Sequence, residues 1–200
     1  QVLEFTVAHS GNYGADFSVA AISDAGDDFT PSANVVFVES GGGAGYQPGV
    51  DTATYIDELA ADSSIVVYVV SSIPGSPTNG QTAVVHLQAT AREGGAASSL
   101  GSVLVETGGA DTPGSVDFVF NDGAGSAPGD GARDGLHSDD GTFTVVSASI
   151  AVTKSSSVIS DPVNGGSNPK RIPGAVVEYT ISLQNNGSAT ADNLSIADVI

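Results

Sequence analysis

The amino-acid sequence predicts an all-β protein built as a β-sandwich. Apolar residues recur at a spacing of two along most of the chain, the period of a half-buried strand, and a spacing of 3.6 is almost absent. Clusters rich in Gly, Pro, Asn and Asp separate the short apolar runs, and the 200 residues include 26 Gly and 9 Pro. Many short strands joined by such turns are typical of β-sandwiches. The length allows one large domain, or one complete and one partial smaller domain.

The first part of the chain is expected to form strands at every alternating apolar run. The continuous apolar run at 65–70 predicts a strand buried on both faces, and 52–61 is the only helix-like stretch. The turn-rich stretch 121–141 is expected to be a loop. The predicted strands are residues 2–8, 16–22, 34–39, 65–71, 82–91, 115–120 and 142–153. Core aromatic side chains are expected at Phe5, Phe17, Phe37, Tyr68, Phe118, Phe120 and Phe143.

Two further strands are expected near the C-terminal end, at 176–184 and 193–199. The dipeptide Pro173-Gly174 predicts a tight turn before the first of them. Apolar and polar residues then alternate through 177–184, and Asn186-Gly187 is a strong hairpin signal. A sheet made from residues 149–200 alone would hold about three strands, with open edges and too little core to be stable.

Charge divides the chain into two parts. The net charge is −18, and the shortage of Lys and Arg argues strongly against nucleic acid as a partner. Residues 1–148 hold 19 acidic and two basic residues, a net charge of −17, whereas 149–200 hold four and three, a net charge of −1. We therefore predict an acidic domain at 1–148 and a partial second domain at 149–200. No apolar run approaches the length of a membrane span.

The acidic stretch 121–141 is the candidate metal site. Carboxylates on Gly-bearing loops can supply the oxygen ligands that Ca²⁺ prefers, although their spacing is not that of an EF-hand. Two interpretations stay open, a calcium site or a solvated acidic loop. A weaker group surrounds the Gly-rich loop 41–45. The calcium candidates are Asp122, Asp130, Asp134, Asp139 and Asp140, and the weaker group is Glu39, Asp51 and Asp57.

Catalytic motifs are missing from the sequence. The chain has no Cys, which removes disulfides and thiolate chemistry. His9, His86 and His137 lie far apart and show no zinc-binding spacing, so we expect no enzymatic activity. Lys154 is either a solvated edge charge or one partner of an isopeptide crosslink, for which Asp198 is a candidate.

A resemblance to a known family rests on three stretches: AVTKSSSVISDPVNG at 151–165, NPKRIPGAVVEYTI at 168–181 and QNNGSATADNLSIAD at 184–198. They resemble the conserved repeat domain of large bacterial surface proteins, an immunoglobulin-like module found in tandem arrays. Residues 5–12 and 59–63 look like the related module that often precedes it. The resemblance implies an immunoglobulin-like β-sandwich followed by a partial second one.

The expected function follows from the pattern and the resemblance together. Both ends of the chain lie in strand-like sequence, which suggests a piece of a longer polypeptide. We expect a non-enzymatic extracellular module at the cell surface, assembled into a fibre or stalk by strand addition with other copies of itself or with adjacent repeats. The alternative is an adhesin or ligand-binding module whose acidic loops contact a cell-surface ligand.

Overall fold

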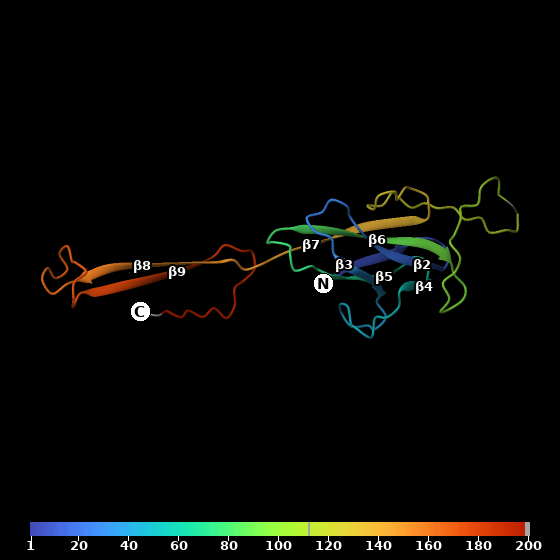
Figure 1. The fold of residues 1–200 in the computed structure, drawn as a ribbon. Coiled ribbons are helices and arrows are strands. Elements are labelled where there is room, and N and C mark those ends of the chain that lie inside the picture. Colours follow the sequence, from blue (N-terminus) through green and yellow to red (C-terminus); the bar gives the residue numbers. More distant parts are fainter. Residues whose placement is uncertain (112, 199–200) are drawn as a thin grey trace. The chain divides into compact units, whose positions relative to one another are not determined.

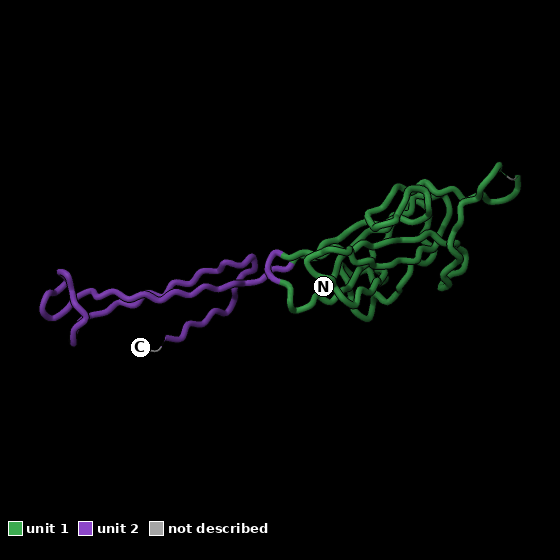
Figure 2. The backbone as a smooth tube through the Cα atoms, turned by 45° about the horizontal axis from the view of Figure 1, so that its top comes forward, with its two compact units in different colours: residues 1–77, 81–144 green, residues 78–80, 145–200 purple. Residues whose placement is uncertain are grey.

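The computed structural model describes residues 1–111 and 113–198. The protein is all-β: these residues contain nine strands in three antiparallel sheets and no helix. Within them, no helix is long and apolar enough to cross a membrane. The chain forms two compact units, shown in Figure 2: unit 1 holds residues 1–77 and 81–144, and unit 2 holds 78–80 and 145–200. The domain boundary predicted from charge, at 148 and 149, stays a prediction.

Unit 1 begins with a three-stranded sheet in the order β1-β5-β3. Its strands are β1 (Val2–His9), β3 (Ser32–Val38) and β5 (Ser63–Ser72). The continuous apolar run lies in β5, the central strand, where Val67 and Val69 are fully buried and Tyr68 is 2 % exposed. A central strand with side chains buried on both faces is what an uninterrupted apolar run predicts, so this prediction is confirmed.

The second sheet of unit 1 has four strands in the order β4-β2-β6-β7. They are β2 (Ala15–Ser23), β4 (Tyr55–Leu59), β6 (Thr82–Glu93) and β7 (Leu136–Thr144). Gly141 of β7 lies against β1 of the other sheet, because a Cβ at this position would come within 3.0 Å of both Leu3 and Phe5. Apolar side chains of both sheets are buried, which is consistent with a β-sandwich. They include Phe5, Val36, Val38, Ile56, Leu59, Val67, Val85, Leu87 and Phe143.

The helix-like interpretation of 52–61 is wrong. This stretch contains β4, which pairs with β2 through Ile56 opposite Phe17 and Tyr55 opposite Ser18. Ile56 and Leu59 are buried. Their spacing of three imitates a helix, but the register shifts between Ala15 and Phe17 of β2, and this irregularity brings both side chains inward.

Three other predicted segments differ in the structure. Residues 136–141, which the turn residues place in a loop, belong to β7, and this strand is paired along its length with β6. Residues 142–153 do not form one strand, because β7 ends at Thr144 and β8 begins at Ile150. Residues 115–120 are not a strand, although Thr107 N donates to Phe118 O over 2.9 Å. Local alternation is therefore a weaker guide here than pairing with a neighbouring strand.

Unit 2 contains a two-stranded antiparallel sheet, seen as the paired arrows β8 and β9 in Figure 1. Its strands are β8 (Ile150–Ser160) and β9 (Val176–Asn185). Asn186 N donates to Ser149 O over 2.7 Å at one end of the hairpin. The predicted strand at 193–199 is not formed over 193–198, and Val199 lies outside the described residues.

Candidate functional site

Two of the predicted calcium ligands hold the backbone of their own loop. Asp122 accepts from the N–H groups of Asp134 and Gly135, each over 3.3 Å. Asp130 is buried and accepts from Gly125 N over 3.0 Å and from the Ser138 hydroxyl over 2.6 Å. Both carboxylates therefore hold the backbone of the acidic loop and the start of β7.

The other three candidates, Asp134 before β7 and Asp139 and Asp140 within it, are exposed. Asp134 accepts from Gly131 N and Leu136 N, each over 3.0 Å, and Asp139 accepts from Asp140 N over 2.9 Å. No three of the five aspartates bring carboxylate oxygens within 4.8 Å of one another. The structure therefore does not assemble these side chains into a compact ligand set, and calcium binding by the loop stays a prediction.

Glu39 and Asp51, from the weaker group, organise the Gly-rich loop. Glu39 accepts from the Tyr68 hydroxyl over 2.7 Å and from Gly41 N over 2.9 Å. These two bonds lower the pKa of Glu39, and the carboxylate together with burial raises the pKa of Tyr68 to about 12. Asp51 is fully buried and accepts from Gln47 N over 2.7 Å, which lowers its pKa. The third member, Asp57, lies in β4 and joins a different cluster.

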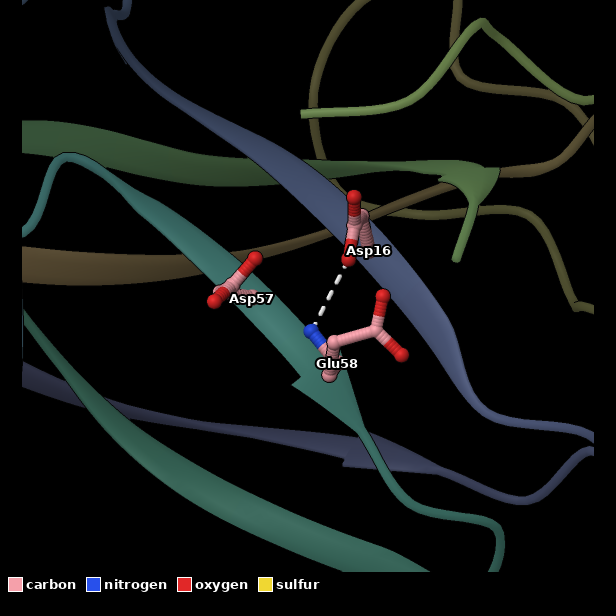
Figure 3. Close-up of side chains that lie close together, drawn as sticks. All are labelled: Asp16, Asp57 and Glu58. Carbon is pink, nitrogen blue, oxygen red and sulfur yellow. Dashed lines mark hydrogen bonds between the residues drawn. The ribbon is translucent and has the colours of Figure 1, made fainter. Parts of the chain in front are cut away.

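That cluster is the one trio of His, Asp or Glu, among the described residues, whose ligand atoms lie within 4.8 Å of one another. It consists of Asp16, Asp57 and Glu58 (Figure 3). Asp16 is fully buried and accepts from Glu58 N over 2.8 Å and from Gly101 N over 2.9 Å. Asp57 accepts from Ser98 N over 2.9 Å, and Glu58 accepts from Gly95 N.

Sequence reasoning missed this trio. Asp16 lies in a predicted strand, and the bonds from Glu58 and Gly101 join residues 42 and 85 positions away. A local sequence pattern cannot reveal contacts between residues so far apart in the sequence. All three carboxylates accept from backbone N–H groups, so the trio has a structural explanation: it fastens the 95–101 loop to β2 and β4.

The histidines do not come together. His86 is buried in β6, where Nδ1 bonds the Ser126 hydroxyl over 2.9 Å. His9 bonds Tyr13 O over 2.5 Å, and His137 bonds Gly123 O over 3.1 Å. No histidine of the described residues belongs to a compact group of three possible metal ligands.

The β8–β9 sheet of unit 2 presents one apolar face. Residues directly opposite each other share a face of a sheet, and Val152 lies opposite Leu183, Lys154 opposite Ile181 and Val158 opposite Val177. The alternate positions carry mostly Ser, Thr, Glu and Gln. Of the described residues of unit 2, none of the apolar side chains is buried. The sheet therefore has a core-forming face without a packed core.

Both outer edges of this sheet are open. Asn186 and Ser149 form a hydrogen-bonded pair, and such pairs alternate along an antiparallel ladder. The backbone groups of Tyr179 and Ile181 consequently point away from β8, and those of Val152 and Lys154 point away from β9. No third strand in the described residues pairs with either edge, although the Arg171 guanidinium donates to Ser156 O on the edge of β8 over 3.3 Å.

Lys154 is bound to the predicted candidate Asp198. Its Nζ lies 2.6 Å from Asp198 Oδ1 and 4.7 Å from the centre of the Tyr179 ring. The side chains of Lys154 and Asp198 are 39 % and 28 % exposed. This is an ion pair open to solvent, and no other ion pair reaches either side chain among the described residues. A crosslink at this position stays a prediction.

Comparison of the chain with known protein families, with curated proteins and with solved structures finds no match.

Proposed function

We propose that this chain is a non-enzymatic structural module of an extracellular surface protein, and that unit 2 is completed by strand addition. The observation that carries the proposal is the β8–β9 sheet: among the described residues no third strand pairs with its edges, and none of the apolar side chains of its face is buried. The added strands come from an adjacent repeat of the same polypeptide or from another copy of the chain.

A two-stranded sheet is at best marginally stable in water. Its unpaired N–H and C=O groups accept a further strand without distortion, and its apolar face gains stability when another layer covers it. On this face Val152 and Tyr179 are 61 % and 44 % exposed, so apolar surface is available for burial. Strand addition supplies backbone hydrogen bonds and cover together.

The carboxylates of unit 1 support a structural role. Those of Asp16, Asp51 and Asp130 are buried and engaged by backbone or hydroxyl donors of nearby loops. Acids used in this way hold loops in place. The net charge of −18 keeps an abundant extracellular protein soluble.

Sedimentation velocity over a range of protein concentrations tests self-assembly. We expect the average mass to rise with protein concentration. For Ile181→Pro, the same rise should require a protein concentration about tenfold higher. Proline is tolerated at an outward N–H of an edge strand but cannot donate to an added strand. Thr6→Pro, the same change on an edge of unit 1, is the matched control and should associate like the unchanged chain.

A monomer at every concentration, with β8 and β9 amides as protected from hydrogen exchange as those of β5, would contradict the proposal. Unit 2 would then be stable without any added strand. A monomer with unprotected β8 and β9 amides would support completion by an adjacent repeat, and a fused further repeat should restore the protection.

A further inference from the structure

We propose that unit 1 binds an extended polypeptide strand of a partner protein along the outer edge of β1, and that this strand carries alternating apolar side chains together with basic residues. The site is separate from the open sheet of unit 2. It consists of an unpaired strand edge, an apolar cavity beside it and an acidic rim.

The cavity measures about 810 Å³ and lies between the two sheets of unit 1. Every residue from 3 to 12 lines it, and so do 118–122 and 139–141. Successive side chains of a strand point to opposite faces. A cavity along the strand's edge contacts all of them in turn, as this one does. Its volume lies within the range of protein ligand sites, about 300 to 1,000 Å³.

The backbone of β1 offers regularly spaced donors and acceptors to this cavity. Gln1 N donates to Ser71 O over 2.8 Å, and Ser71 N donates to Gln1 O over 2.9 Å, which makes them a hydrogen-bonded pair. The alternation of an antiparallel ladder then directs the N–H and C=O groups of Glu4, Thr6 and Ala8 away from β5. The bond from Glu39 N to Val66 O on the other side of β5 fits the same alternation.

No described strand pairs with this edge of β1. At the opposite edge of the cavity, β7 is partly covered, because Ser126 N donates to Ser138 O over 3.0 Å. Residues 118–122 line the cavity but form no strand. The edge of β1 is thus the open template.

An extended polypeptide fits this site better than a lipid or another purely apolar molecule. Leu3, Phe5, Leu87 and Phe118 supply an apolar wall. A lipid would cover the backbone groups of β1 and leave them without hydrogen-bond partners, which is unfavourable for each buried group. An added strand pairs those groups and places every second side chain against the apolar wall.

The rim selects the sign of the partner's charge. Glu4, Asp122, Asp139 and Asp140 line the cavity, and of the described residues that line it none is Lys or Arg. Basic side chains on the bound strand would relieve this excess of negative charge. A second copy of this chain, with a net charge of −18, is a poor match for the same rim.

Calorimetric titration of the full chain with a synthetic peptide tests the proposal. The probe is an acetylated and amidated peptide of alternating Lys and Val, about eight residues long to match β1. The control peptide has the same sequence with N-methyl groups on alternate residues, which keeps charge and apolar surface but blocks strand pairing. We expect the probe to bind one site per chain, and the N-methylated peptide to bind at least about tenfold more weakly.

Thr6→Pro removes an outward donor of β1 and should weaken binding by a similar factor, whereas Ile181→Pro on unit 2 should leave it unchanged. Hydrogen exchange on the unchanged chain gives a readout that needs no variant. The amides of Glu4, Thr6 and Ala8 should exchange fast in the free protein and slowly with the peptide present.

Three results would overturn the proposal: equal binding of both peptides, which indicates attraction of charge alone; equal binding by Thr6→Pro and the unchanged chain; or slow exchange of these amides in the free protein. In the last case a segment of the chain itself, such as 115–120, or a second copy would already occupy the edge. None of these results bears on strand addition at unit 2, which is read from self-association.

Discussion

Buried aspartates fasten the loops of this protein to its strands. Among the described residues, Asp16, Asp51, Asp130 and Asp161 are buried, and each accepts hydrogen bonds from a nearby or distant loop. A carboxylate is an acceptor with several lone pairs, so it can satisfy more than one backbone N–H at a time. Bonds to a charged acceptor are stronger than bonds between neutral groups.

The role of Asp16 can be tested by Asp16→Asn. The amide keeps the shape but places its NH₂ group against a backbone N–H, either that of Glu58 or that of Gly101. One buried donor then lacks an acceptor, and we expect the free energy of unfolding to fall by about 1–3 kcal/mol. Chemical denaturation measures the change. Asp62→Asn is the control, because Asp62 is exposed and its φ of 55° suits Asn equally well; an equal loss in both variants would contradict the assignment.

Asp161 makes the loop between β8 and β9 sensitive to acid. The backbone N–H groups of Asn164 and Lys170 lower its pKa from 3.8 to about 2. A carboxyl whose folded pKa is depressed stabilises the folded loop above its unfolded pKa, and this contribution is lost as the pH falls from about 4 toward 2. The amide resonances of Val163 and Lys170 should therefore shift with a midpoint near pH 2, and the shift should vanish in Asp161→Asn. A midpoint near the ordinary 3.8 would show that these bonds do not favour the charged form.

At the scale of single elements, close backbone contacts fix the loop that follows β6. A Cβ on Gly101 would lie 2.7 Å from the carbonyl carbon of Glu93, which is backbone and cannot rotate away. Gly101→Ala should therefore lower the free energy of unfolding by about 1–3 kcal/mol. A Cβ on Gly75 would meet nothing within 4 Å, so Gly75→Ala should be neutral or stabilise by up to about 1 kcal/mol. Thermal melting of the two variants compares them directly, and similar melting temperatures would be inconsistent with the close contact.

The elements that were predictable are those whose pattern is local. The uninterrupted apolar run of β5 and the strict alternation of β9 indicate strands without reference to the rest of the chain. β4 was missed because Ile56 and Leu59 have a helical spacing, and most of β7 was missed because Asp139, Asp140 and Gly141 are typical turn residues. Both strands exist because a partner strand pairs with them.

The candidate sites likewise show that local sequence patterns do not reveal contacts between residues distant in the sequence. The loop acids at 122–140 are close in sequence and were easy to find, yet the compact trio is Asp16, Asp57 and Glu58, which tertiary packing brings together. The open edge of β1 depends on which strands pair, and no property of residues 2–9 alone reveals it.

At the scale of the molecule, the two units differ in how they are held together. Unit 1 has a sandwich with a buried core on both sheets, whereas the described apolar side chains of unit 2 are all at least partly exposed. Local stability follows the amount of buried apolar surface. We therefore expect unit 2, and not unit 1, to depend on added strands for its stability.

Backbone hydrogen exchange of the full chain, measured at low and at high protein concentration, tests this claim most directly. In the dilute protein the amides of β8 and β9 should exchange far faster than those of β5. At high concentration the outward amides of Tyr179 and Ile181 should become protected, because an added strand accepts their hydrogen bonds. Slow exchange throughout β8 and β9 in the dilute monomer, unchanged by concentration, would contradict the account.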